Sequence, residues 1–162
     1  MLRRLIITLI LASFPLHSSY GVITHSLDYN KLCDDLLSGD ASTAELMQGF
    51  VRLQWDIEEL IREAHNANEV VVKKGIQAAH NYLDLAKIYH EGAITDYFPT
   101  RHLELTGPKR EEIEQEYSQY TQAFVRMAEK LLQLLENKEY EKAKEHFLNI
   151  ADFYNRAHRK FI

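Results

Sequence analysis

Two histidines fall within the apolar faces of predicted helices. Near the end of the chain, apolar residues recur every three or four positions, and His158 lies one turn after Tyr154 and one turn before Phe161. His90 continues a second apolar face, seven residues after Leu83. A neutral imidazole is the commonest metal ligand among side chains. Each histidine is therefore a candidate ligand, although a carbonyl group or a water molecule would equally satisfy a histidine in an ordinary core.

Side chains with complementary chemistry are predicted to lie at the same end of the molecule. Met47 offers a thioether sulfur, and Phe50, Tyr117 and Tyr120 offer flat aromatic surface. Together with the two histidines they define a candidate pocket for a flat cofactor or a metal ion. Methionine and aromatic residues at helical spacing are also ordinary core residues, so the spacing alone leaves both interpretations open.

Four amphipathic helices must position these side chains. The apolar periodicity predicts helices over about 43–64, 69–91, 109–136 and 139–161. Ser42 and Glu45 have the spacing of a capping box at the start of the first helix. The second helix is predicted to turn inward Val72, Ile76, Ala79, Leu83, Ala86 and His90. Short, long and short connections favour an all-α, antiparallel up-down-up-down four-helix bundle over residues 42–162.

Two further segments accompany the predicted bundle. Residues 22–41 form an N-terminal extension in which leucines at loosely helical spacing, ending near Gly39, predict a short helix. The long connection over 93–108 contains Tyr97 and Phe98, which suggests that it packs on the bundle and is not a free linker.

The first 21 residues have the pattern of a cleaved secretory signal peptide. Two arginines precede an apolar run from Leu5 to Phe14, which is too short to cross a bilayer of about 30 Å, and small residues end at Gly21. We therefore expect a periplasmic protein without a stable membrane span. The net charge of -5 argues against a nucleic-acid partner. Cys33 is the single cysteine, so no internal disulfide can form.

The last helix resembles that of the cytochrome b562 family, which comprises soluble periplasmic haem proteins with an up-down-up-down bundle. The resemblance is carried by residues 135–143 and above all by 154–161, which end the chain. It implies a non-covalent haem b with His158 as an iron ligand, contacts from Tyr117 and Tyr154, and Arg156 near the propionates. Related c-type proteins attach haem through two cysteines, and Tyr154 and Ala157 stand at those positions here.

The resemblance leaves the second axial ligand open. Met47 is the counterpart of the family's methionine, but counting from the shared first turn puts that position near Phe50 or Val51. The difference is about one helical turn, or 5.4 Å. Met47 could bind iron after a register change, the iron could be five-coordinate beneath Phe50 as in cytochromes c-prime, or no haem could bind. His90 is a weaker candidate for the distal ligand.

The expected function is electron transfer between haem and a periplasmic redox partner protein, by a monomer or weak dimer without enzymatic activity. Two alternatives belong to other classes. The chain could be a cofactor-free periplasmic bundle that binds a protein or small ligand and has lost the haem. Alternatively, His90 and His158 could hold zinc or copper, although two imidazoles with a tyrosine or methionine make a thin ligand set.

Overall fold

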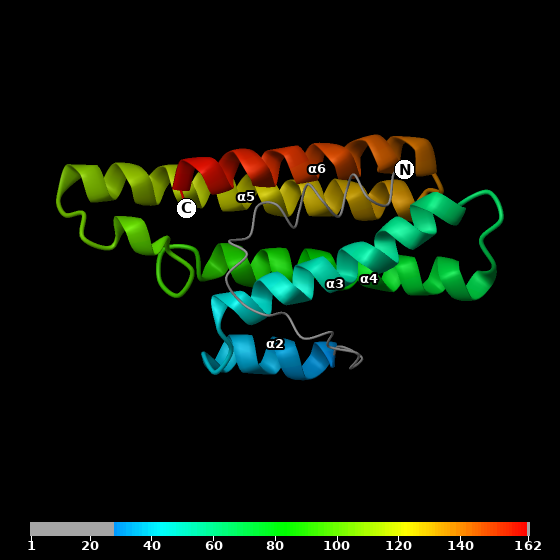
Figure 1. The fold of residues 1–162 in the computed structure, drawn as a ribbon, viewed down its shortest axis with the longest axis horizontal. Coiled ribbons are helices and arrows are strands. Elements are labelled where there is room, and N and C mark those ends of the chain that lie inside the picture. The colour runs from blue at the N-terminus through cyan, green and yellow to red at the C-terminus, as the bar shows by residue number, and fades with distance from the viewer. Residues whose placement is uncertain (1–27, 162) are drawn as a thin grey trace.

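The structure is a computed structural model that describes residues 28–161. The predicted signal peptide and the first residues of the extension lie outside this range. The described helices are α2 (Tyr29–Ser38), α3 (Thr43–Glu63), α4 (Glu69–Glu91), the short 3-10 helix η1 (Thr100–His102), α5 (Pro108–Glu136) and α6 (Tyr140–Phe161). Figure 1 shows α3 to α6 running up and down as one elongated bundle, with α2 lying across one side. The predicted fold class, including the short N-terminal helix, is confirmed.

Local sequence signals explain where the helices begin and end. The Ser42 hydroxyl accepts from the amide of Glu45 at 3.3 Å while the Glu45 carboxylate accepts from the amide of Ser42 at 2.8 Å, which completes the predicted capping box. Asn68 caps α4 through the amide of Val71. Gly39 ends α2 with a φ of 80°, a left-handed conformation that glycine adopts without steric cost.

The long helices pack in sequence order. Each of α3, α4 and α5 packs extensively on the next helix, whereas α3 and α6 touch much less than these sequential pairs do. The α3–α4 contact is close because Gly75 has no side chain, and a Cβ there would lie 2.5 Å from the Cβ of Leu60. The small helix α2 buries Leu32 and Leu36, and the Tyr29 hydroxyl donates to the carbonyl of Asn81 on α4 at 3.1 Å. The contact between α3 and α6 is therefore the sparsest side of the bundle, and we call it the seam.

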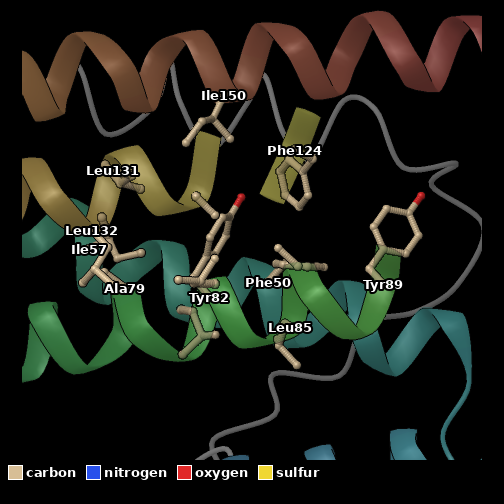
Figure 2. Close-up of a cluster of buried hydrophobic side chains, with 14 of the residues drawn as sticks. Phe50, Ile57, Ala79, Tyr82, Leu85, Tyr89, Phe124, Leu131, Leu132 and Ile150 are labelled. Atoms are coloured by element: carbon tan, nitrogen blue, oxygen red, sulfur yellow. The ribbon is translucent and has the colours of Figure 1, made fainter. Parts of the chain in front are cut away.

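Aromatic rings fill the interior at the end of the bundle that carries the candidate site. Figure 2 shows Phe50, Tyr82, Tyr89 and Phe124 gathered between the helices. The Phe50 ring meets those of Tyr82 and Phe124 edge-on, with centroids 5.0 and 5.4 Å apart. Such edge-to-face contacts add to the stabilisation from apolar burial. The core at this end is thus built mainly from aromatic rings in edge-to-face contact.

The long connection between α4 and α5 covers this end, as its aromatic residues predict. Tyr97 and Phe98 are buried, and the Arg110 guanidinium lies 4.0 Å from the centre of the Phe98 ring. Leu103, by contrast, is exposed. Within the described residues, no helix is sufficiently long and apolar to span a membrane.

Candidate cofactor site

The predicted site residues come from three helices that meet at or beside the seam. Met47 and Phe50 lie on α3, Tyr117 lies on α5, and Tyr154 and His158 lie on α6. They surround two small neighbouring cavities rather than one large pocket. Met47, Phe50 and Tyr154 line the first cavity, whereas Tyr117, Tyr154 and His158 line the second. The helix pairing thus brings these five predicted residues together, with Tyr154 common to both cavities.

Each cavity has a volume of about 20 Å³, which is room for about one water molecule. Tyr154 and Phe124 line both cavities. The remaining walls are mainly apolar and aromatic, with contributions from Val51, Ala151 and Ala157. The site as it stands is a pair of water-sized spaces on either side of a tyrosine ring.

Each cavity is lined by one residue that has a buried polar atom without a hydrogen-bond partner. In the first, the Gln54 side chain donates its amide N–H to the Tyr82 hydroxyl at 3.1 Å, but its Oε1 is enclosed without a hydrogen-bond partner. In the second, His158 Nδ1 is likewise enclosed without a partner. Buried polar atoms are normally satisfied by protein or by ordered water. Gln54 Oε1 can only accept a hydrogen bond, and His158 Nδ1 accepts one in the tautomer protonated at Nε2, so an occupant that donates a hydrogen bond would satisfy both atoms.

Burial lowers the pKa of His158. His158 also lies in the last turn of α6, where the helix dipole favours a cation and therefore raises the pKa. The effect of burial is larger, so the pKa is lowered. The imidazole is accordingly neutral near pH 7. The neutral form is the one that binds metal ions and accepts hydrogen bonds.

Tyr154 touches candidate residues on both sides. Its hydroxyl donates to the Sδ atom of Met47 at 3.5 Å, and its ring lies nearly parallel to that of His158, with centroids 6.3 Å apart. The sulfur of Met47 is thereby engaged by the tyrosine. This pairing across α3 and α6 involves residues 107 positions apart.

Two other tyrosines at this end donate hydrogen bonds to backbone carbonyl groups. Tyr117 donates its hydroxyl to the carbonyl of Tyr97 at 3.1 Å and accepts from the hydroxyl of Tyr89. Burial raises the pKa of Tyr117 to about 12. Tyr120 donates to the carbonyl of Phe153 at 2.7 Å. These phenols remain protonated under ordinary conditions and act as hydrogen-bond donors.

His90 and Arg156 lie apart from the cavities. The Thr121 hydroxyl donates to the Ser118 carbonyl at 3.0 Å. His90 Nδ1 lies 2.8 Å from the Thr121 hydroxyl oxygen, so it is the donor in that contact. His90 therefore has a structural partner on α5 and lines neither cavity. Arg156 is exposed on α6 and lies 3.5 Å from the Asp152 carboxylate.

The apolar face predicted for α4 is rotated by about one residue from the face that the structure buries most deeply, and this rotation explains why His90 is predicted to face inward. The structure buries the predicted Ala79, Leu83 and Ala86 and also Tyr82, Leu85 and Tyr89, whereas Ile76 and His90 are only half-buried. The reason is that α4 packs against α2, α3 and α5, so a broad face is covered instead of a narrow one. Tyr82, Tyr89 and Gln54 are the lining residues that the sequence reasoning missed. Gln54 stands one turn after Phe50, and that spacing could have identified it.

The described residues contain no group of three or more histidine, cysteine, aspartate or glutamate side chains able to hold a metal ion. A haem would need far more room than the two cavities provide, since cofactor pockets span roughly 300–1,000 Å³. Accommodating it requires Tyr154 to leave the interior and α6 to separate from α3 at the seam. No protein-family model, curated protein sequence or solved structure was found to match the chain significantly. Fold and site thus define the class as an up-down helical bundle with an aromatic, histidine-containing seam.

Proposed function

We propose that the chain is a periplasmic electron-transfer protein that binds one non-covalent haem b, with His158 as the proximal iron ligand. The observation that carries the proposal is the state of His158. Its imidazole is neutral, lines an apolar cavity at the seam and has an enclosed nitrogen without a hydrogen-bond partner. A rotation of the imidazole about its bond to Cβ exchanges the positions of Nδ1 and Cδ2 and those of Nε2 and Cε1, so the ring edge that faces inward can change.

The seam supplies the route by which the interior opens. It is the least-packed side of the bundle, and Tyr154 is held there by a hydrogen bond to sulfur, a weak acceptor. When Tyr154 turns outward, the space between Met47 and His158 is cleared. Apolar walls including Phe50 and Phe124 then exclude water from the bound group.

The same movement releases the second candidate ligand. Met47 loses its hydrogen bond from Tyr154 and becomes free to act as the distal ligand, while Phe50 remains as the apolar alternative beneath a five-coordinate iron. Arg156 offers a cation on the outer side of α6 for carboxylate groups at the surface. Bound haem would supply the one-electron chemistry, with its potential set by the axial ligands and by burial.

The test is the visible spectrum of the full chain, purified from haem-replete cells and after addition of haem. A Soret band at one haem per chain is expected, and His158→Ala should abolish or strongly shift it. His146→Ala is the matched control, because His146 lies on the same helix and donates Nε2–H to the carbonyl of Met127 at 2.8 Å. The absence of a Soret band in the wild type, or an unchanged band in His158→Ala, would overturn the proposal.

A second experiment identifies the distal ligand. Met47→Leu preserves volume but removes the sulfur. If Met47 binds iron, the reduced spectrum and the redox potential of this variant should change, since a methionine ligand raises the potential. An unchanged reduced spectrum would exclude Met47 as a ligand and leave either the five-coordinate arrangement beneath Phe50 or His90.

One observation favours a second candidate, a cofactor-free binding module. Rings from α3, α4 and α5 already meet edge-to-face at centroid distances of 5.0 to 6.5 Å, so the interior is complete without a cofactor. This candidate predicts that added haem changes neither the spectrum nor the thermal midpoint of the protein. Both quantities should change if haem binds the native state.

A further inference from the structure

The hydrogen bond that Tyr154 donates is weaker than those that Tyr117 and Tyr120 donate at the same end of the bundle. Tyr117 and Tyr120 donate to backbone carbonyl oxygens at 3.1 and 2.7 Å, whereas Tyr154 donates to the Met47 sulfur at 3.5 Å. Thioether sulfur is a weak acceptor. Tyr154 is also only half-buried, and it lies at the sparsest helix contact of the bundle. The Tyr154 ring can consequently leave the interior with the smallest loss of stabilising contacts.

Departure of the Tyr154 ring would join the two cavities. Both have this ring as a wall, so the combined space would include the volume of a phenol in addition to the two water-sized ends. An apolar cavity of roughly 150 Å³ is enough to bind benzene. The opened space therefore fits a single aromatic ring without any movement of the helices.

The two unpartnered polar atoms determine which ring would bind best. Gln54 uses its amide N–H on Tyr82, so its Oε1 can only accept a hydrogen bond. His158 Nδ1 is enclosed without a partner, and it is also an acceptor in the neutral tautomer that carries its proton on Nε2. Two acceptors in an apolar surrounding favour an uncharged ligand that carries hydrogen-bond donors, because a charged group would lose its hydration there.

We propose that the seam between α3 and α6 is a binding site for a small uncharged phenol-like ring, and that the Tyr154 side chain is its internal substitute. Tyr154 itself supports this assignment, since it places a phenol ring beside His158 and the phenol hydroxyl beside Met47. An external phenol competes with this side chain for the same space. The apparent affinity of the wild type is then reduced by the fraction of molecules in which Tyr154 is inside.

The proposal is tested on haem-free protein without added haem, so its outcome is independent of the proposed electron-transfer function. Phenol and toluene have similar shapes, but only phenol donates a hydrogen bond. Each is titrated into the wild type, Tyr154→Ala and the double variant Tyr154→Ala/His158→Leu, with calorimetry for affinity and the His158 imidazole NMR signals for location. Tyr140→Ala, at the opposite end of α6, is the matched control.

We expect phenol to bind the wild type at one site and Tyr154→Ala at least about tenfold more tightly, with Tyr140→Ala equal to the wild type. In Tyr154→Ala, phenol should exceed toluene by about tenfold, the effect of leaving a buried acceptor unpaired. The double variant should lose most of that preference. Equal affinities of phenol and toluene, or no phenol binding by the wild type and Tyr154→Ala at millimolar concentration, would overturn the proposal.

A milder variant keeps the test valid if Tyr154→Ala does not fold, as judged by circular dichroism. Tyr154→Phe retains the ring and removes its hydrogen bond to Met47. The side chain is then displaced more easily, and phenol should bind a few-fold more tightly than to the wild type. Unchanged phenol affinity in a folded Tyr154→Phe variant would contradict the internal-substitute role.

Discussion

The hydroxyl groups of Tyr89 and Tyr117 hydrogen-bond to each other in the interior of the bundle, and Tyr117 donates onward to the carbonyl of Tyr97 at 3.1 Å. This series of hydrogen bonds joins α4, α5 and the connection between them. Since Tyr117 uses its proton on Tyr97, Tyr89 must be the donor to Tyr117. Three elements at the aromatic end are therefore fixed by one directional series of hydrogen bonds, which leaves the seam as the side that can open.

The first prediction concerns this series. Tyr117→Phe keeps the ring but leaves the Tyr89 hydroxyl and the Tyr97 carbonyl without their partner. Unsatisfied buried groups cost about 1–3 kcal/mol, so the free energy of unfolding in urea should fall by that amount. Tyr140→Phe is the control, because its hydroxyl makes no hydrogen bond recorded within residues 28–161. Equal stabilities of the two variants would show that the series contributes nothing.

The second prediction is a pH dependence that arises from His158. Burial lowers its pKa in the folded state below the ordinary value of about 6.5, so around and below that pH the unfolded chain binds more protons than the folded one. The free energy of unfolding should therefore decrease as the pH falls from about 7.5 to 5.5, and it should be fully retained above the ordinary pKa.

His158→Leu should make this decrease shallower when urea unfolding is measured across the same pH range. Some dependence will persist, because burial and the neighbouring Arg101 also lower the pKa of His102. His65→Gln is the control, since the His65 side chain is 85% exposed. A slope identical to that of the wild type in His158→Leu would contradict the burial of this imidazole.

The third prediction tests the close crossing of α3 and α4. An alanine Cβ at Gly75 would lie 2.5 Å from the Cβ of Leu60, an overlap that a side-chain rotation cannot relieve. Overpacking of this kind costs typically 1–3 kcal/mol, partly offset by the roughly 1 kcal/mol that alanine gains over glycine within a helix. We expect a net loss of about 1–2 kcal/mol in urea unfolding. Lys73→Ala, on an exposed position of the same helix, should change stability by less than about 0.5 kcal/mol.

Helical periodicity predicts the fold because burial in a bundle repeats with the helical turn. Leu46, Phe50, Leu53, Ile57 and Leu60 occur at this spacing, and all five are buried on α3. The inward face of α4 is harder to predict, since three neighbouring helices cover it. Periodicity predicts the centre of the buried face of a helix, but it does not predict how much of the helix circumference the neighbouring helices cover.

The contacts within the candidate site depend on how each helix is rotated about its own axis, which the local sequence does not determine. The contact between Tyr154 and Met47 lies at the seam between α3 and α6, and a rotation of either helix by one residue would break it. Gln54 is polar and falls outside the apolar stripe, although it lines the first cavity and its buried oxygen has no hydrogen-bond partner. Spacing identifies His158 and Met47 as candidates, whereas the division of the site by Tyr154 becomes apparent only in three dimensions.

The final prediction follows from the shared use of the seam by both proposals. If haem and a phenol-like ring each require Tyr154 to turn outward, they exclude one another, and each lowers the apparent affinity of the other by the same factor. Saturating phenol should therefore slow the appearance of the Soret band and reduce its final height when haem is limiting, whereas toluene should have a smaller effect. Tyr154→Ala should take up haem faster than the wild type, because the step that clears the site is absent. Additive binding, with haem and phenol bound to one chain at full affinity, would place the two ligands at different sites and would separate the phenol site from the haem ligand His158.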